Sequence, residues 1–426
     1  MVHWSNRRRG LTLLVALMAA SVVAVGVYAT ISRSKETLHA SGRVAYVVDG
    51  NLIIKELPDG EPRQITYEGN VSIPIWSATG EWLSYNTASS NQGGEGGAGI
   101  ANAGTGDSRE VERPVVWAPT RDYLVTSGSK FDELIVTLPD GTLIREIDSS
   151  TGLSGILVWT SDNEGVTYLR LLEGSRGAET RLLAMNTGSD ELLYTSQSEI
   201  PRLFGWSSDG QYLFFSDSGS LKILSLPDRE VTDTGINVFL FTPEDELMQQ
   251  PGGSSILVVE ATARDLWQGK QIGLLEPATG AFRRLTQPDM AAMHPRWSPD
   301  GEQIAYVASP ARQSDTDSPS RQETEALLAD RHIWIMDADG SNKRRLTSEP
   351  RYRDGAPEWT ADGGHLIFAR VDLEFPDQAP SLWALDISGR ATIVVEEMSY
   401  SLDRQEDIPQ YARFLGTLNR LYDFHE

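Results

Sequence analysis

Cysteine is absent from this chain of 426 residues. Its absence excludes disulfides, thiolate-bound metals, cysteine nucleophiles and the lipidated cysteine of a bacterial lipoprotein. The fold must therefore be stabilised by packing. A hydrophobic content of 40% provides enough material for a substantial core.

Recognisable catalytic and metal-binding motifs are missing as well. The sequence has no Gly-x-Ser-x-Gly pentapeptide, the turn that presents a serine nucleophile in α/β hydrolases. Its six histidines form neither a His-x-His nor a His-Glu-x-x-His set, the spacings that place two imidazoles on one metal ion. We therefore predict no catalytic residue, no metal ligand and no cofactor.

Positive charge is scarce. The chain has 37 lysines and arginines against 60 aspartates and glutamates, which gives a formal net charge of -23. So acidic a surface repels phosphate backbones and anionic lipid head groups. Nucleic acid is therefore not an expected partner.

One uncharged apolar run, residues 11–30, follows three arginines at positions 7–9. About 20 apolar residues suffice to cross a bilayer as a helix, and basic residues on the N-terminal side favour a cytoplasmic N-terminus. We therefore predict a single-pass protein of the cell membrane with most of the chain outside the cytoplasm. The predicted segments are residues 1–9 in the cytoplasm, a transmembrane signal-anchor at 10–30 and a polar tether at 31–41.

Cleavage of this segment is the alternative. The stretch Val27-Tyr28-Ala29 places small residues where a signal peptidase needs them. Because the apolar run is longer than the usual core of a signal peptide, we favour its retention as an anchor.

A recurring tryptophan dominates the rest of the sequence. The clearest copies are Trp297-Ser-Pro-Asp-Gly301 and Trp359-Thr-Ala-Asp-Gly363, and Phe241-Thr-Pro-Glu-Asp245 is a degenerate copy. The seven copies are separated by 41, 42, 47, 35, 56 and 62 residues. A period in the forties, with strand patterns inside each period, predicts an all-β fold of the β-propeller type. The recurring tryptophans are Trp76, Trp117, Trp159, Trp206, Trp297 and Trp359.

Each repeat contains four strand patterns, which we label a to d from the ring centre outward. After Trp297, an Asp-Gly turn leads to alternating strands at residues 303–309 and 332–336 and an outer strand at 343–347. Glycine accepts a positive φ in such turns at little cost. We assign the six tryptophans a structural role as wedges between blades, with an indole N–H that needs a partner when buried.

The Trp-Ser-Pro-Asp-Gly stretches resemble the TolB-type, WD-like propeller repeat, and the resemblance extends over about residues 42–397. Families with this repeat include periplasmic interaction proteins and the propeller halves of some serine peptidases. Those peptidases carry a separate catalytic domain, and no residues remain here to build one. The resemblance therefore implies a propeller at residues 42–404 without a second catalytic fold.

The turns between strands c and d give an independent count of the blades. The sequence contains eight such turns but only seven inner-strand motifs. The turn without an inner-strand motif belongs to residues 43–65, which show the patterns of strands b, c and d but not of strand a. A ring closes well when one blade combines strands from both chain ends. We therefore favour eight blades, with seven as the close alternative, and expect Met398 to Leu402 to supply the missing inner strand.

The tail at residues 405–426 is predicted to be helical. Pro409 suits a first helical turn, and apolar residues follow at helical spacing. Docking of this helix onto the propeller and binding of a partner remain alternatives. The spaced residues are Tyr411, Phe414, Leu415, Leu418 and Tyr422.

Insertions cluster in the b–c loops, which share one face of a propeller with the d–a loops. Loops on a rigid scaffold often carry binding sites, so we expect this face to bind a ligand. Trp267 lies in one of these loops outside the repeat pattern, and His294 precedes an inner strand near the central channel. Both are candidate binding residues. The long loops are residues 89–98, 172–179, 261–269, 310–331 and 371–380.

The predicted function is a membrane-anchored, extracytoplasmic propeller that acts as a protein-protein interaction scaffold through its b–c loops. Its partner is an unidentified protein or envelope component. The alternative is a metal-assisted hydrolase or lyase that acts on a sugar or peptide in the central channel.

Overall fold

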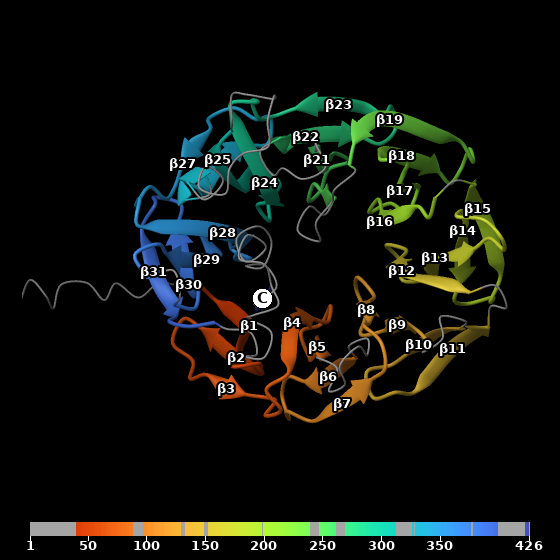
Figure 1. Ribbon diagram of the computed structural model, residues 1–426, viewed down its shortest axis with the longest axis horizontal. Helices are drawn as coiled ribbons and strands as arrows, with labels where there is room; N and C mark the ends of the chain where they lie inside the picture. The colour runs from red at the N-terminus through yellow and green to blue at the C-terminus, as the bar shows by residue number, and fades with distance from the viewer. Residues whose placement is uncertain are drawn as a thin grey trace, which may run out of the picture. The chain divides into compact units, whose positions relative to one another are not determined.

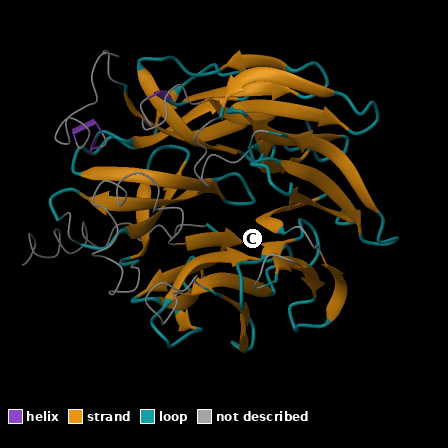
Figure 2. Ribbon diagram, turned by 45° about the vertical axis from the view of Figure 1, so that its right-hand side comes forward, coloured by secondary structure: helices purple, strands orange, loops and turns teal. Residues whose placement is uncertain are grey.

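Eight antiparallel sheets of four strands each form a ring around a central opening (Figure 1). This confirms the predicted all-β propeller and the count of eight blades over seven. Figure 2 shows that the described fold consists mainly of strands joined by loops and turns. The computed structural model describes residues 40–87, 97–128, 133–148, 152–197, 199–238, 247–260, 269–311, 326–327, 329–375, 378–398 and 422–425.

The strands follow the order a to d within each blade. Blades 1 to 4 consist of β32 (Tyr422–His425), β1 (Gly42–Val48), β2 (Asn51–Leu57) and β3 (Arg63–Gln64); β4 (Val71–Trp76), β5 (Trp82–Thr87), β6 (Ala98–Asn102) and β7 (Ser108–Val111); β8 (Val116–Trp117), β9 (Leu124–Ser127), β10 (Glu133–Thr137) and β11 (Leu143–Asp148); and β12 (Leu153–Trp159), β13 (Gly165–Leu171), β14 (Ala178–Ala184) and β15 (Asp190–Ser196). Blades 5 to 8 consist of β16 (Arg202–Trp206), β17 (Tyr212–Asp217), β18 (Ser220–Ser225) and β19 (Val231–Asn237); β20 (Met248–Gln249), β21 (Ile256–Glu260), β22 (Gln271–Glu276) and β23 (Ala281–Arg284); β24 (Met290–Trp297), β25 (Gln303–Pro310), β26 (His332–Asp337) and β27 (Arg344–Arg345); and β28 (Tyr352–Trp359), β29 (His365–Asp372), β30 (Ser381–Asp386) and β31 (Ala391–Val395).

The ring is closed by the end of the chain, but by other residues than predicted. Strand β32 pairs antiparallel with β1, with Tyr422 opposite Tyr46. Met398 is buried and donates its N–H to the Pro380 oxygen at 2.8 Å, but it pairs with no strand. The expected inner strand at 398–402 was therefore wrong at Met398, and residues 399–402 lie outside the described residues.

The predicted C-terminal helix was wrong at residues 422–425, which form a strand. Residues 405–421 lie outside the described part of the chain. The strand forms because β1 offers an unpaired inner edge, and because Phe424 takes the place that tryptophan has in six of the other seven blades. Gly42 makes room for this ring, since a Cβ there would lie 2.4 Å from Phe424.

Each recurring tryptophan connects two neighbouring blades. Its indole N–H donates to the preceding blade, to a backbone oxygen or a side-chain hydroxyl, at 2.9–3.2 Å. The hydrogen bond satisfies the one polar atom of a large apolar wedge, so the indole can be buried at low cost. The donor and acceptor pairs are Trp76 and Asp423, Trp117 and Ser84, Trp159 and Val116, Trp206 and Thr167, Trp297 and Met248, and Trp359 and Arg296.

Blade 6 begins later than predicted. Phe241 lies outside the described residues, and the inner strand of this blade ends at Gln249. The following turn at Gln250 is closed by a hydrogen bond from its N–H to the Ser255 oxygen at 2.9 Å. Ser298 after Trp297 makes the equivalent bond, also at 2.9 Å, to residue 303. Gln249 therefore occupies the tryptophan position, 43 residues after Trp206.

No helix among the described residues has the length and apolarity needed to cross a bilayer. The predicted cytoplasmic segment, signal-anchor and most of the tether fall on residues 1–39, which lie outside the described part of the chain.

Candidate functional site

The face of the ring that carries the b–c and d–a connections, called the b–c face below, is unevenly built. In blades 6, 7 and 8 the strands b and c are separated by residues 261–270, 311–331 and 373–380. In blades 1 and 5 only two residues separate them, at 49–50 and 218–219. A fourth long connection, residues 88–97, belongs to blade 2. The other three long connections lie together on consecutive blades.

Buried positive charges gather in the same three blades. Among the described residues, four lysine or arginine side chains are buried, with exposed fractions between 2% and 7%, and all four belong to blades 6 to 8. Burying a charge costs several kcal/mol unless partners compensate for the lost hydration. Such a concentration distinguishes this part of the ring from the other blades. The four residues are Lys270, Arg331, Arg353 and Arg370.

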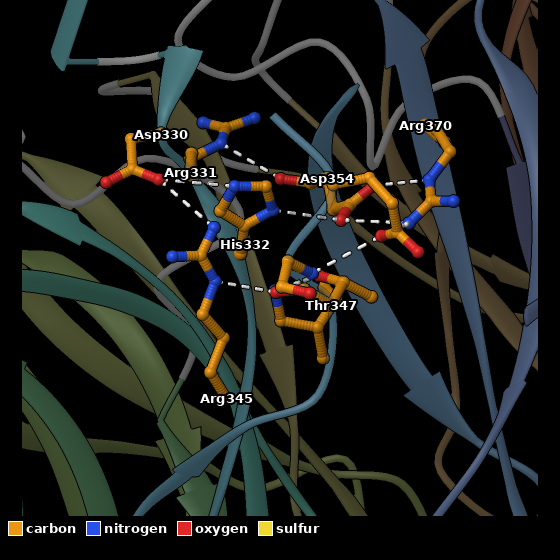
Figure 3. A network of polar contacts seen from close by, with 10 residues as sticks. Asp330, Arg331, His332, Arg345, Thr347, Asp354 and Arg370 are labelled. Carbon is orange, nitrogen blue, oxygen red and sulfur yellow. Dashed lines mark hydrogen bonds and ion pairs between the residues drawn. The ribbon is translucent and has the colours of Figure 1, made fainter. Parts of the chain in front are cut away.

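The centre of this cluster is an ion pair between neighbouring strands (Figure 3). Asp354 on β28 and Arg370 on β29 are register partners, and both are almost completely buried. The Arg370 Nε donates to Oδ1 of Asp354 at 2.7 Å, and Nη2 donates to Oδ2 at 3.2 Å. At the equivalent register position blade 7 has Ala292 opposite Ala308. The pair is therefore a feature of blade 8 that the repeat itself does not require.

Two residues of blade 7 also contact Asp354, and Figure 3 shows them on the side opposite Arg370. The His332 Nδ1 lies 3.4 Å from its Oδ2, and the Arg331 Nε donates to its backbone oxygen at 3.1 Å. Burial alone would raise the pKa of Asp354, but the hydrogen bonds from His332 and Arg370 outweigh it and lower the pKa. A fully buried carboxylate is thus kept ionised.

Arg370 is fixed by aromatic rings as well as by Asp354. Its guanidinium carbon lies 4.6 Å from the ring centre of Tyr352, 4.8 Å from that of Trp383 and 5.0 Å from that of Phe368. Cation–π contacts in desolvated surroundings contribute about 2 kcal/mol. The charge network is therefore rigid, and it joins blades 7 and 8.

His294 lies in the middle of the inner strand β24, where the pairing with β25 is interrupted by a bulge. Its φ is 51°, and Pro295 follows. The same bulge with a positive φ before proline occurs at Ile73 in β4 and at Ala356 in β28. Proline has no N–H to donate to the ladder, so each bulge places it where no hydrogen bond is lost.

The side chain of His294 is 3% exposed, and its Nδ1 has no hydrogen-bond partner. Burial, followed by the positive charges of Arg331, Lys270 and Arg296, lowers the pKa of His294 well below its usual value. The imidazole is therefore neutral near pH 7. The sequence analysis named His294 as a candidate binding residue, and the structure places its imidazole near positively charged side chains.

Acid sensitivity is the expected consequence. In the unfolded chain histidine titrates near a pKa of about 6.5. Below that pH the unfolded state binds a proton that folded His294 does not bind, so the free energy of unfolding falls as the pH falls; above it this residue makes no pH-dependent contribution. His294→Ala should therefore lose less stability than the wild type between pH 7.5 and pH 5, as measured by urea denaturation. Equal losses in the two proteins would contradict this.

The structure gives no support to the other candidate binding residue or to a metal site. Trp267 lies outside the described residues. The described residues contain no group of three His, Asp or Glu side chains that could hold a metal ion.

Sequence reasoning missed Arg331, Arg353, Asp354 and Arg370. Alignment of the repeats distinguishes three of them by residue type, since Arg353, Asp354 and Arg370 of blade 8 stand where blade 7 has Ala291, Ala292 and Ala308.

Comparison with known proteins supports the fold and leaves the family open. No family model matches the chain. The chain is 26% identical over 132 residues to an uncharacterised peptidase, YuxL, of Bacillus subtilis, and the match covers 31% of this chain but only 17% of that protein. The dihydro-heme d1 dehydrogenase NirN is similar in structure, with a TM-score of 0.55, 13% identity and coverage of 86% of this chain and 76% of that one.

The fold is similar to TolB-type and other β-propellers. TolB of Acinetobacter baumannii matches with a TM-score of 0.38 and 15% identity, over 90% of this chain and 71% of that chain. At such low identities the likeness concerns the fold alone. The activity must be inferred from the chain's own residues.

Proposed function

We propose that this protein is a binding module that recognises a protein partner through the b–c face of blades 6 to 8. The observation that carries the proposal is the coincidence, on three consecutive blades, of long b–c connections with the buried charge network around Asp354. The sheets of blades 6 to 8 fix the strand ends from which the b–c connections of this face begin.

The N-terminal sequence supports a location for this module. The apolar run at residues 11–30 and the arginines at 7–9 favour a propeller tethered outside the cytoplasm. The partner is then a protein of the cell envelope or of the extracellular space. A net charge of -23 speaks against nucleic acid.

Site-specific photo-crosslinking in living cells tests the proposal. Phe375 lies in the b–c connection of blade 8 with 49% of its surface exposed, and Ile387 lies in the c–d turn of the same blade with 46% exposed. The two residues match in exposure but belong to opposite faces. Phe375→p-benzoylphenylalanine should give a discrete protein adduct after irradiation, and Ile387→p-benzoylphenylalanine should give none.

The comparison of the two faces decides the outcome. An adduct of equal yield from Ile387, or no adduct from Phe375 in cells that express the full chain, would contradict the b–c face as the binding surface. Mass spectrometry of the adduct identifies the partner.

A further inference from the structure

Aromatic rings and guanidinium groups alternate in blade 8. The guanidinium carbon of Arg370 lies 4.8 Å from the ring centre of Trp383 and 4.6 Å from that of Tyr352. The guanidinium carbon of Arg351 lies 5.3 Å from the same ring of Tyr352 and 5.7 Å from the ring of Phe375. In order of contact, this cation–π series consists of Trp383, Arg370, Tyr352, Arg351 and Phe375.

The cation–π series runs from the interior of the blade to solvent. The side chain of Arg370 is 3% exposed, that of Arg351 is 43% exposed, and Phe375 keeps 49% of its surface exposed. Tyr352 contacts two guanidinium groups, whereas Phe375, among the described residues, contacts that of Arg351 alone. The series therefore ends at the b–c face on an aromatic ring that is half open to solvent.

Ion pairs and backbone hydrogen bonds fix this outer end. The Arg351 Nε donates to both carboxylate oxygens of Asp372, at 3.0 and 2.9 Å, and its Nη1 lies 3.3 Å from Oε2 of Glu374. The Phe375 N–H donates to the Asp372 backbone oxygen at 3.3 Å, and the Leu373 N–H donates to the Arg351 backbone oxygen at 2.8 Å. The connection thus presents the Phe375 ring from a backbone that is bound to strand β29 and to Arg351.

The surroundings of the series are acidic. Its two arginines lie within 4 Å of four carboxylates, which leaves a local excess of two negative charges. The hydrogen bond from Arg351 is the main cause that lowers the pKa of Asp372, so this carboxyl is ionised. Two of the four carboxylate side chains are also exposed, at 62% and 56%. A cation is therefore attracted to this end of the b–c face. The four residues are Asp354, Asp372, Glu374 and Glu349, of which the last two are the exposed ones.

The propeller repeat does not require the cation–π series. Blade 7 has the same sheet, and its strands a and b pair with the same register around the bulge. It nevertheless lacks the aromatic, cationic and acidic side chains of blade 8 at three positions. Met290, Ala308 and Pro310 stand there in place of Tyr352, Arg370 and Asp372.

We propose that Phe375 binds an arginine side chain of the protein partner, which adds the next guanidinium to the cation–π series, and that Glu374 pairs with its charge. This inference rests on the proposed function and specifies the chemistry of the partner. Arg351 is the precedent, because its guanidinium already contacts the same ring and the same carboxylate. A carboxylate has about four acceptor sites, so Glu374 can accept a second guanidinium beside Arg351. A planar guanidinium stacks on an aromatic ring better than an ammonium does.

Fluorine NMR with a label at the proposed contact tests this assignment. Phe375→4-fluorophenylalanine labels the ring itself, and Ile387→4-fluorophenylalanine labels the opposite face at a matched exposure of 46%. The probes are acetyl-arginine-methylamide, its lysine analogue and its citrulline analogue, which has the shape of arginine without the charge. Each probe is titrated into the full-length protein in a nonionic detergent, at low and at high salt.

The arginine probe should shift the fluorine resonance at position 375 saturably, the lysine probe should bind more weakly, and the citrulline probe should not bind. High salt should weaken the binding of arginine, and no probe should give a saturable shift at position 387. Phe375→pentafluorophenylalanine removes the negative potential of the ring face. It should weaken the binding of arginine about two- to fivefold, the value of an exposed cation–π contact.

Three results would overturn the arginine subsite: equal binding of the arginine and citrulline probes, an equal saturable shift at position 387, or equal affinity of the two fluorinated variants at position 375. Equal binding of the lysine probe would overturn the assignment to arginine. Because Phe375 is an exposed loop residue, its fluorinated variants should fold like the wild type.

The two proposals fail in different ways. An adduct at Phe375 without binding of the arginine probe leaves the b–c face as the binding surface and removes the arginine subsite. Binding of the arginine probe at position 375 without an adduct in cells keeps the subsite and removes the proposed protein-binding surface.

Discussion

A chain that ends at residue 421 is expected to lose most of its stability. Strand β32 pairs with β1 over four residues and fills the centre of blade 1, where Tyr422 is buried. The Tyr422 hydroxyl donates to the Ala356 oxygen in blade 8, and Trp76 of blade 2 donates two hydrogen bonds to Asp423. Four residues thus hold three blades together.

The expected loss is large on the scale of domain stability. Truncating one buried aromatic side chain costs about 3–5 kcal/mol, and the deletion also leaves the edge of β1 unpaired. The total should exceed about 5 kcal/mol, comparable with the whole free energy of unfolding of many domains, about 5–15 kcal/mol. Urea denaturation followed by tryptophan fluorescence measures it.

Tyr422→Phe is the control for this deletion. It keeps the ring and removes only the hydroxyl, so a loss of about 1–2 kcal/mol is expected. A truncated chain with the denaturation midpoint of the wild type would show that blade 1 is stable with three strands.

Breaking the Asp354–Arg370 pair from one side is expected to have the next largest effect. Asp354→Ala leaves a buried guanidinium without its carboxylate, and Arg370→Ala leaves the carboxylate with His332. Removing one partner of a buried pair typically costs about 3–5 kcal/mol. The double variant recreates the pair of Ala292 and Ala308 found in blade 7, so it should lose less than the sum of the two single losses.

A double-mutant cycle by urea denaturation measures this coupling. Strictly additive losses would mean that the two side chains stabilise the fold independently, contrary to the geometry.

The same pair makes a pH-dependent contribution with a defined sign. The pKa of Asp354 is lowered in the fold, against about 3.9 in an unfolded chain. Its contribution to stability is therefore fully present above about pH 4 and is lost as the pH falls through the lowered value. The double variant should show a shallower loss of stability than the wild type below about pH 4.

The eight blades could be predicted because their turns demand particular backbone angles. Gly188 and Gly340, in two of the predicted c–d turns, have φ values of 72° and 83°, which favour glycine and leave a mark in the sequence. The turn of blade 5 is harder to recognise in the sequence, because Arg229 rather than a glycine adopts the positive φ there, at 59°.

The closing strand could not be predicted for a physical reason. A strand of four residues is too short to show alternation, and Tyr422 also fits the helical spacing of the residues before it. Its conformation is decided by the free edge of β1, which lies nearly the whole chain away. Blade 6 was misplaced because Gln249 replaces the tryptophan that marks the inner strands of six other blades.

The candidate site was predicted only at His294. The other residues of the site lie on or next to different strands of blades 6, 7 and 8, and the ring brings them together. A charged side chain near the end of a strand is normally exposed to solvent. Nothing in the sequence therefore predicts that the side chains of Arg331 and Arg370 are buried. Their burial becomes visible only when the packing of blade 7 against blade 8 is known.

Closure by β32 also sets the order of events during synthesis. The ribosome produces β1 first among the described strands and its inner neighbour β32 last, so β1 keeps an open edge until residues 422–425 have been synthesised. Blade 1 is therefore the last of the eight to be completed, whatever the other seven do earlier. Chains that stop before residue 422 retain that edge, which can pair with strands of other molecules.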